Sequence, residues 1–184
     1  GEIEESLDFL AVSLRNVPLR HRSLRAVFDH SWQMLAPDEQ QILLRLSVFQ
    51  GGFTREAAAQ VGRAQLPQLS ALVDRSLVQR ADAGRFSLHN VIRQYAAEKL
   101  QADPAAYADT TRRHGDYYLR WLLAQADQLR GAGQKEALTA VAADLGNIRT
   151  AWQWAAVNQQ CNLLSLAAFP LFYFFELRGL LAEG

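Results

Sequence analysis

Apolar positions change their spacing twice within residues 66–100. At the start of this stretch they recur at three- and four-residue steps, as one buried face of a helix requires. The spacing falls to two across residues 78–80 and again across 85–88, on either side of an Asp-Ala-Gly turn, which predicts a β-hairpin. The helical spacing returns from Asn90. The stretch therefore predicts a helix, a short hairpin and a second helix.

Three further helices are predicted between residues 20 and 62. Ser23 and Thr54 are suitable N-caps for the first and the third, and Pro37 lies in the first turn of the second. Gly51-Gly52 is predicted to end that second helix. Three helices followed by helix, hairpin and helix make a winged-helix domain, which we place at residues 20–103. Before it, residues 1–19 are predicted to hold a short acidic helix and a linker.

Residues 104–184 show no strand pattern. Two amphipathic helices are predicted, with stripes running from Tyr107 to Gln125 and from Leu138 to Ala155, and a third follows in which nearly every position is apolar. The fold class is therefore mainly α, a winged helix with a small β-hairpin wing followed by α-solenoid-like helical hairpins. The apolar last helix needs cover on both sides. Two readings stay open: a repeat that follows beyond the chain, or a homodimer contact.

Composition narrows the class of protein. The 184 residues include 19 basic and 19 acidic side chains, and residues 20–100, with eleven basic and seven acidic ones, are mildly positive. The single cysteine, Cys161, excludes an internal disulfide and favours a reducing, cytoplasmic setting. No membrane association is expected, because the apolar stretch at residues 158–175, which includes Asn158, Asn162, Ser165 and Pro170, is a marginal span. A start at Gly1 without an initiator Met leads us to expect a piece of a longer protein.

Four segments together resemble bacterial STAND-type signal-transduction ATPases, which are close to the NB-ARC group and are related to transcriptional regulators. The segments are RHRSLRAVFDHSWQML, LSVFQGGFTREAA, LVDRSLVQ and FSLHNVIRQYAAEKL. The resemblance implies that residues 1–19 end a helical subdomain and that residues 104–184 begin a tetratricopeptide-like repeat region. It implies a regulatory and interaction module, with the winged helix as nucleotide-state switch and the repeats as sensor or partner platform for an unknown protein or small-molecule inducer.

The family's Met-His-Asp motif stands here as Leu88-His89-Asn90. The resemblance implies that His89 senses the β-phosphate of ADP in the longer protein, while Asn90 lacks the family's carboxylate. ADP or ATP with Mg²⁺ would then be bound by a nucleotide-binding domain preceding this chain, with which the winged helix would pair. No GxxxxGK[ST] loop occurs in the sequence, so no cofactor and no enzyme activity are expected of the chain itself.

The alternative function is that of a winged-helix DNA-binding domain in a transcription factor. The predicted reading helix offers Arg75 beside Asp74, and the wing adds Arg80 and Arg85 as candidate nucleic-acid contacts. Because groove reading usually takes several basic or amide side chains, we expect DNA contact to be unlikely and any binding to be weak and sensitive to salt.

Other candidate sites are sparse. The four histidines show no metal-ligand spacing, and one cysteine makes no thiolate site, so no metal is expected. His114 is predicted at the edge of a helix face. Aromatic side chains off the predicted stripes, or on the apolar last helix, are candidates for a partner surface: Tyr117, Trp154, Phe172 and Phe175.

Overall fold

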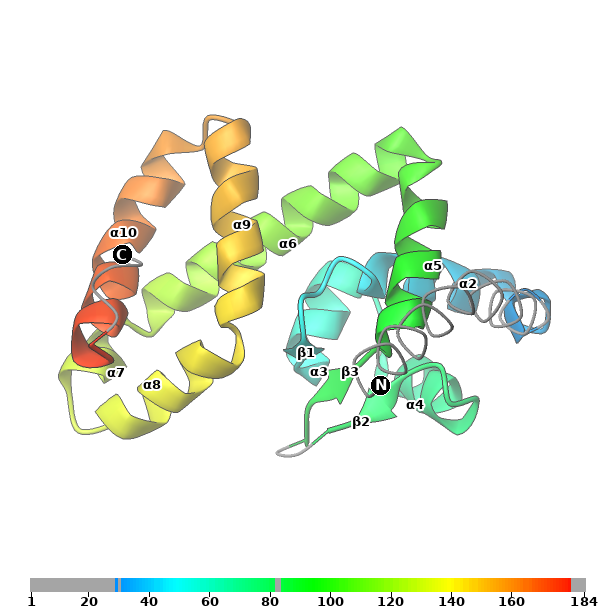
Figure 1. The fold of residues 1–184 in the computed structure, drawn as a ribbon, viewed down its shortest axis with the longest axis horizontal. Coiled ribbons are helices and arrows are strands. Elements are labelled where there is room, and N and C mark those ends of the chain that lie inside the picture. The colour runs from blue at the N-terminus through cyan, green and yellow to red at the C-terminus, as the bar shows by residue number, and fades with distance from the viewer. Residues whose placement is uncertain (1–28, 30, 82–83, 180–184) are drawn as a thin grey trace, which may run out of the picture. The chain divides into compact units, whose positions relative to one another are not determined.

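The structure is a computed structural model that describes residue 29 and residues 31–81 and 84–179 (Figure 1). The chain divides into two compact units, residues 1–40 and 41–184. In the first unit, residues 31–33 are helical, and the amide of Ala36 donates to Glu39 Oε2 at 2.9 Å. The predicted helix at residues 2–14, its linker and the Ser23 cap lie outside the described residues.

The winged-helix domain alternates short helices with very short strands. In chain order its elements are α2 (Pro37–Leu46), β1 (Gly52–Phe53), α3 (Arg55–Ala57), the π-helical turn η1 (Ala58–Gly62), α4 (Leu66–Asp74), β2 (Gln79–Arg80), β3 (Phe86–Ser87) and α5 (Asn90–Gln101). The predicted helix, hairpin and helix of residues 66–100 are thus α4, β2–β3 and α5. This confirms the mainly helical fold class with its small wing.

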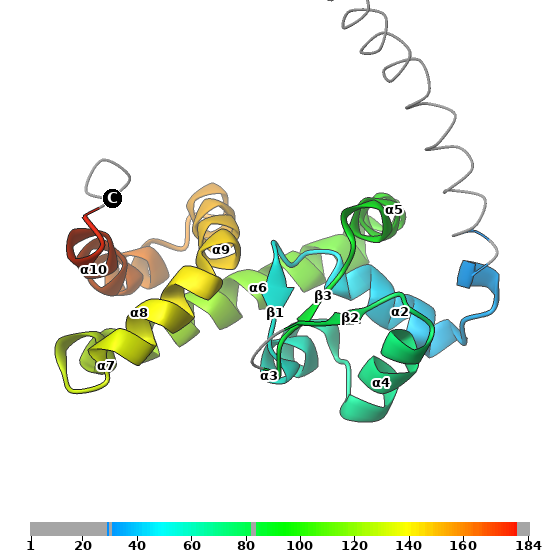
Figure 2. The same cartoon turned by 60° about the horizontal axis from the view of Figure 1, so that its bottom comes forward.

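The sheet has a third strand that the sequence pattern did not predict. β3 lies between β1 and β2 and is antiparallel to both (Figure 2). The prediction that Gly51-Gly52 ends a helix is wrong, because α2 already ends at Leu46 and Gly52 is paired with Ser87 in the sheet. Gly51 serves the turn instead, with φ at +87°. A two-residue strand is too short to show alternation, so β1 leaves no periodic signal.

The core of the winged-helix domain is aromatic on the sheet side and aliphatic on the helix side. Phe49 stacks on Phe53 with ring centroids 4.5 Å apart, and Phe53 stacks in turn on Phe86. The buried aliphatic residues come from the predicted helix stripes: Ile42, Leu43, Leu46, Leu69, Leu72, Ile92 and Leu100. Thr54 caps α3 as predicted, accepting from the amide of Ala57 at 3.1 Å.

The region after residue 103 is entirely helical where the structure describes it. Its elements are α6 (Pro104–Ala124), α7 (Ala126–Arg130), α8 (Gln134–Ala143), α9 (Leu145–Val157) and α10 (Cys161–Leu177). Asp103 caps α6 by accepting from the amides of Ala105 and Ala106. The predicted stripe from Leu138 to Ala155 is divided between two helices, because the chain turns at Asp144 (Figure 1).

Two close approaches hold α6 and α9 in place. A Cβ on Gly115 would overlap the Trp154 ring, so this glycine lets α6 and α9 pack closely together. A Cβ on Gly146 would lie 3.0 Å from the backbone oxygen of Gln50, so α9 also begins against the winged-helix domain. A side chain at either glycine would push the two packed segments apart.

α10 is half covered. Ala167, Phe174 and Phe175 are buried, whereas Leu166, Phe169 and Phe172 are exposed. The guanidinium of Arg130 lies 4.1 Å from the centroid of the exposed Phe169 ring. Among the described residues, no helix has the length and the apolar character to cross a bilayer.

Candidate nucleic-acid interface

α4 is anchored on one side and open on the other. Leu69 and Leu72 are fully buried, which fixes the helix against the domain core. Its N-terminus is closed by a capping box in which Gln65 and Gln68 exchange hydrogen bonds. The first turn is exposed through Gln65, Leu66 and Pro67, and the exposed Arg75 ends the helix. α4 therefore presents an amide-rich face with one arginine.

The wing carries two arginines in different environments. Arg80 lies on β2 and is exposed. Arg85 precedes β3 and points back into the molecule, and its side chain is 17% exposed. The turn between them ends at Gly84, whose φ of +72° suits glycine. The hairpin thus offers Arg80 to a partner and directs Arg85 inward.

Arg85 forms a bidentate ion pair with Asp144, at the junction of α8 and α9. Its Nη1 donates to Asp144 Oδ2 at 2.9 Å, and its Nη2 donates to Asp144 Oδ1 at 2.7 Å. The same Nη2 donates to the backbone oxygen of Gly52 on β1 at 2.9 Å. The hydrogen bonds from Arg85 to Asp144 raise the pKa of the guanidinium. Arg85, one of the three predicted nucleic-acid contacts, is therefore bound to the helical region.

Asn147 extends this pair into a buried polar network. Its side-chain amide donates to Asp144 Oδ1 and to the backbone oxygen of Gly52, both at 3.0 Å. Its Oδ1 accepts from the backbone amide of Gln50 at 2.7 Å. The bonds to Gly52 and Gln50 join α9 to β1 and to the segment before it, and so fix the position of the helix against the strand.

Two residues of α6, Tyr118 and His114, complete the network. The Tyr118 hydroxyl donates to Asp144 Oδ1 at 3.2 Å, and burial raises the pKa of this phenol. His114 Nε2 lies 3.3 Å from Asn147 Oδ1, and its ring is 1% exposed. The prediction that His114 lies at the edge of a helix face is therefore wrong. We call Arg85, His114, Tyr118, Asp144 and Asn147 the wing network.

Sequence reasoning missed the wing network because its members are far apart in the chain. Arg85 and Asp144 are separated by 59 residues, and each belongs to a different helical or strand pattern. His114 and Tyr118 were visible only as members of an amphipathic stripe. The predicted stripe gave no signal for Asp144 and Asn147, because it assigns the inward positions to Leu145 and Ile148.

The predicted nucleotide-sensing residues lie at the exposed start of α5. His89 is the N-cap, and its Nδ1 accepts from the amide of Val91 at 3.4 Å. Asn90 accepts from Arg93 at 3.5 Å. Neither contact tests the sensing role, which stays a prediction. The described residues also hold no group of three or more His, Cys, Asp or Glu side chains suited to a metal ion.

The predicted partner residues are more enclosed than their sequence positions indicated. Trp154 is partly buried against Gly115, and Tyr117 is half-buried, with a hydrogen bond to Thr54 and a pKa raised by burial. Phe175 is buried, whereas Phe172 is 53% exposed. Partner contact by these four stays a prediction.

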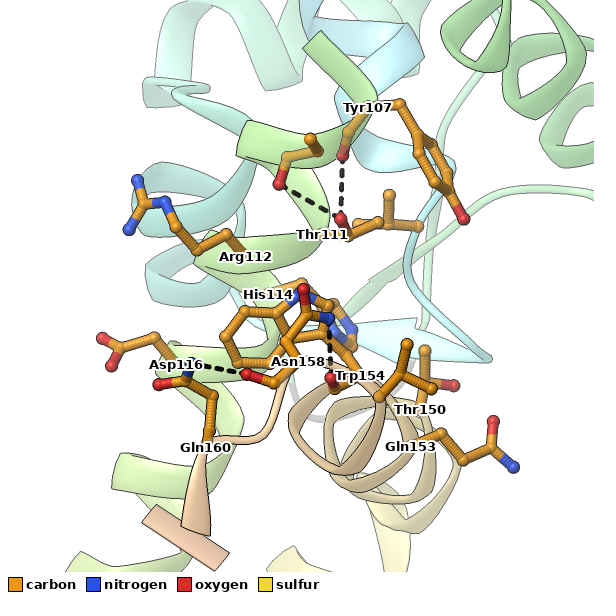
Figure 3. A pocket seen from close by; sticks show the side chains of 13 residues that line it. Tyr107, Thr111, Arg112, His114, Asp116, Thr150, Gln153, Trp154, Asn158 and Gln160 are labelled. Atoms are coloured by element: carbon orange, nitrogen blue, oxygen red, sulfur yellow. Dashed lines mark hydrogen bonds between the residues drawn. The ribbon is translucent and has the colours of Figure 1, made fainter. Parts of the chain in front are cut away.

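A groove of about 780 Å³ lies between α6 and α9 (Figure 3). Trp154 and His114 contribute rings to it, and its polar lining includes Thr111, Gln153 and Asn158. Thr111 and Asn158 already bond backbone oxygens of their own helices, as the dashed lines show (Figure 3). The groove is open to solvent and mixed in character.

Comparison with known proteins finds similarity to a family model and to curated relatives. Residues 35–101 match the family model of the winged helix-turn-helix domain. Two curated relatives are both named "Putative HTH-type transcriptional regulator", Mb0914c of Mycobacterium bovis and Rv0890c of Mycobacterium tuberculosis. Each is 33% identical over 171 residues, which cover 85% of this chain and 19% of the relative. The chain thus spans about a fifth of their length. No solved structure matches the chain.

These matches correct one prediction and leave others unsupported. The expectation that DNA contact is unlikely is overturned by the helix-turn-helix match and by the regulator relatives. Counting arginines on one helix was too narrow a criterion, because amide side chains, backbone N–H groups and helix ends also bind phosphates. The matches do not support the predicted kinship with STAND-type ATPases or the tetratricopeptide-like repeats.

Breaking the ion pair should destabilise the protein strongly. Asp144→Asn keeps the shape but leaves Arg85 without its counter-charge, and we expect a loss of about 3 kcal/mol in the free energy of unfolding. Asp116→Asn is the matched control, since Asp116 pairs with Arg120 on the surface of α6, and should cost less than about 1 kcal/mol. Urea unfolding of the two variants gives the comparison. Equal losses would show that the buried pair contributes no more than the surface pair.

His114 should make stability depend on pH. Burial lowers its pKa from 6.5 to about 4, so the unfolded chain takes up a proton before the folded one does. The stabilisation is complete above pH 6.5 and is lost as the pH falls toward 4, by about 3 kcal/mol in all. His114→Gln keeps an N–H donor for Asn147 but does not titrate. Urea unfolding between pH 7 and 4 should therefore show a steeper loss for the wild type, and parallel curves would contradict this assignment.

Proposed function

We propose that the chain is a DNA-binding module of a transcriptional regulator, in which α4 and the wing contact the duplex. The observation that carries the proposal is the winged helix-turn-helix match over residues 35–101, together with an α4 whose first turn is exposed. Relatives named as helix-turn-helix regulators support the same reading.

The charges on this surface favour modest, salt-dependent affinity. α4 offers amide side chains and Arg75, and the wing offers Arg80, whereas Arg85 is held by Asp144. Amide side chains can pair with adenine edges, and arginines can bind guanine or phosphate. With few cations engaged, few counterions are released, so binding depends on salt but with a shallow slope.

The helical region, in this proposal, is a platform for a partner or an inducer that controls the wing. It holds Arg85 through Asp144 and fixes the segment before β1 through Asn147. A ligand that binds preferentially to one arrangement of α8 and α9 would shift the population of wing positions. A cytoplasmic location suits such a regulator and is part of the same proposal.

DNA binding should weaken when the two exposed arginines are removed. Arg75→Ala and Arg80→Ala should each weaken binding to a random duplex about three- to tenfold, and each should lower the salt slope by about one for a lost phosphate contact. Arg120→Ala, on α6, removes the same charge from a surface outside the winged helix and serves as the control. Fluorescence anisotropy at low salt measures all three. Equal binding by the wild type and the α4 and wing variants would refute the proposal.

A second candidate function is the nucleotide-state switch of a STAND-type ATPase. The geometry of His89 favours it: Nδ1 accepts the Val91 amide at 3.4 Å, which leaves Nε2 as the ring nitrogen that can donate to a ligand. A donor at the exposed start of α5 is suitably placed for an anion, because the helix dipole favours negative charge there.

Nucleotide content separates the two candidates. If the chain is part of such an ATPase, the longer protein should retain ADP through purification, and His89→Ala should release most of it. Gln94→Ala, at an exposed position of α5, is the control and should leave the nucleotide in place. A longer protein that carries no ADP, or an unchanged content in the His89 variant, would remove His89 from any sensing role.

A further inference from the structure

Four arginines, two from the winged-helix domain and two from α6, surround the carboxylate of Asp109 on α6. Arg112 Nη2 lies 2.9 Å from Asp109 Oδ1, Arg113 Nη2 lies 3.1 Å from Oδ2, and Arg63 Nη2 lies 3.6 Å from Oδ2. Arg45, near the end of α2, is close enough to interact electrostatically with both Arg63 and Asp109. We call Arg45, Arg63, Arg112 and Arg113 the arginine cluster.

The arginine cluster is not neutralised. One carboxylate faces four guanidinium groups, and within the described chain Asp109 is the one acid that acts on Arg45 and Arg113. Burial lowers the pKa of Arg45 and repulsion from Arg63 lowers it further. Burial also lowers the pKa of Arg113, which Arg63 and Arg45 both repel. The cluster therefore carries an excess of about three positive charges at close range.

Arg113 also has unmet hydrogen-bonding capacity. Its Nε and Nη1 are buried and have no hydrogen-bond partner, although the Nη2 of the same group is bound to Asp109. A buried charged donor without a partner is costly, so natural proteins rarely keep one without a reason. Asp109, which Arg113 shares with the other arginines, is thus its one hydrogen-bonded counter-charge in the described chain, and positive potential remains at the cluster.

We propose that the arginine cluster is a binding site for a phosphate group. Arg63 and Arg112, which are 61% and 59% exposed, would contact the phosphate oxygens directly. Arg113 and Arg45 lie deeper and supply positive potential behind them. Planar guanidinium groups bind phosphate oxygens through paired hydrogen bonds, which fits this chemistry better than a carboxylate partner alone.

The phosphate can have two sources. Arg63 lies in the turn directly before α4, at φ +57°, a position from which helix-turn-helix proteins reach the DNA backbone. In that case the inference rests on the proposed function and extends the contact surface from α4 to α6. The other source is a small phosphorylated ligand, which would bind whether or not the winged helix binds DNA.

The first experiment asks whether phosphate binds at all. Thermal unfolding is followed in inorganic phosphate and in chloride of equal ionic strength. We expect phosphate to raise the wild-type Tm, and Arg63→Ala and Arg112→Ala to remove most of that rise. Arg120→Ala, which removes an exposed, paired arginine of α6, should keep it. Without phosphate, Arg63→Ala should be at least as stable as the wild type, because it relieves repulsion in the cluster.

The second experiment identifies the source by fluorescence anisotropy with a random duplex. A five- to tenfold weaker complex for Arg63→Ala, with a salt slope lower by about one, would assign the site to the DNA backbone. Unchanged duplex binding together with a lost phosphate effect would assign it to a small phosphorylated ligand. If neither the Tm nor duplex binding responds to Arg63→Ala or Arg112→Ala, the site is refuted. The Arg75 and Arg80 variants test DNA binding by α4 and the wing independently.

Discussion

The ion pair between Arg85 and Asp144 is the constraint on which the arrangement of the second unit depends. It joins the wing of the helix-turn-helix domain to the junction of α8 and α9, two parts of the chain that share no continuous element. Asp144 is 3% exposed, so its charge has left water and must be met inside the protein. The bidentate arginine, the Tyr118 hydroxyl and the Asn147 amide meet it together. These three partners come from the wing, α6 and α9, so the carboxylate joins all three parts of the structure.

In the proposed function, this constraint bears on how the winged helix would bind DNA. A wing usually supplies positive charge to the phosphate backbone, and here one of its two arginines is neutralised internally while Arg80 stays exposed. Any rearrangement of α8 and α9 that released Asp144 would add a cation to the wing and leave a buried carboxylate unpaired. The added cation would favour DNA binding, whereas the unpaired buried carboxylate would destabilise the fold. Release would therefore need binding energy from a partner. The helical region is thus positioned to set the charge that the wing presents.

Much of the fold could be predicted from local sequence patterns, whereas the long-range polar contacts could not. The helical and alternating spacings of residues 66–100 are properties of neighbouring positions, and α4, β2–β3 and α5 follow them closely. The chain turns at Asp144, between α8 and α9, and the partner of this carboxylate is Arg85, 59 residues away, which no local spacing reveals. His114 looked like an edge residue because its partner Asn147 belongs to another helix. β1 is held by pairing with β3 and leaves no periodicity of its own.

Arginine occurs both in the structural ion pair and in the proposed ligand site. The two environments differ in how far the charge and the donors of the guanidinium group are satisfied. Arg85 has a bidentate carboxylate and a backbone oxygen, and its pKa is raised. Arg113 shares one carboxylate with three other arginines, keeps two buried nitrogens without acceptors, and has a lowered pKa. The first environment is complete, since every donor that leaves water finds an acceptor. The second lacks negative charge, which a phosphate group would supply. An arginine that has buried donors without acceptors and shares its one carboxylate with other arginines is therefore the stronger indication of an anion that binds from outside the chain.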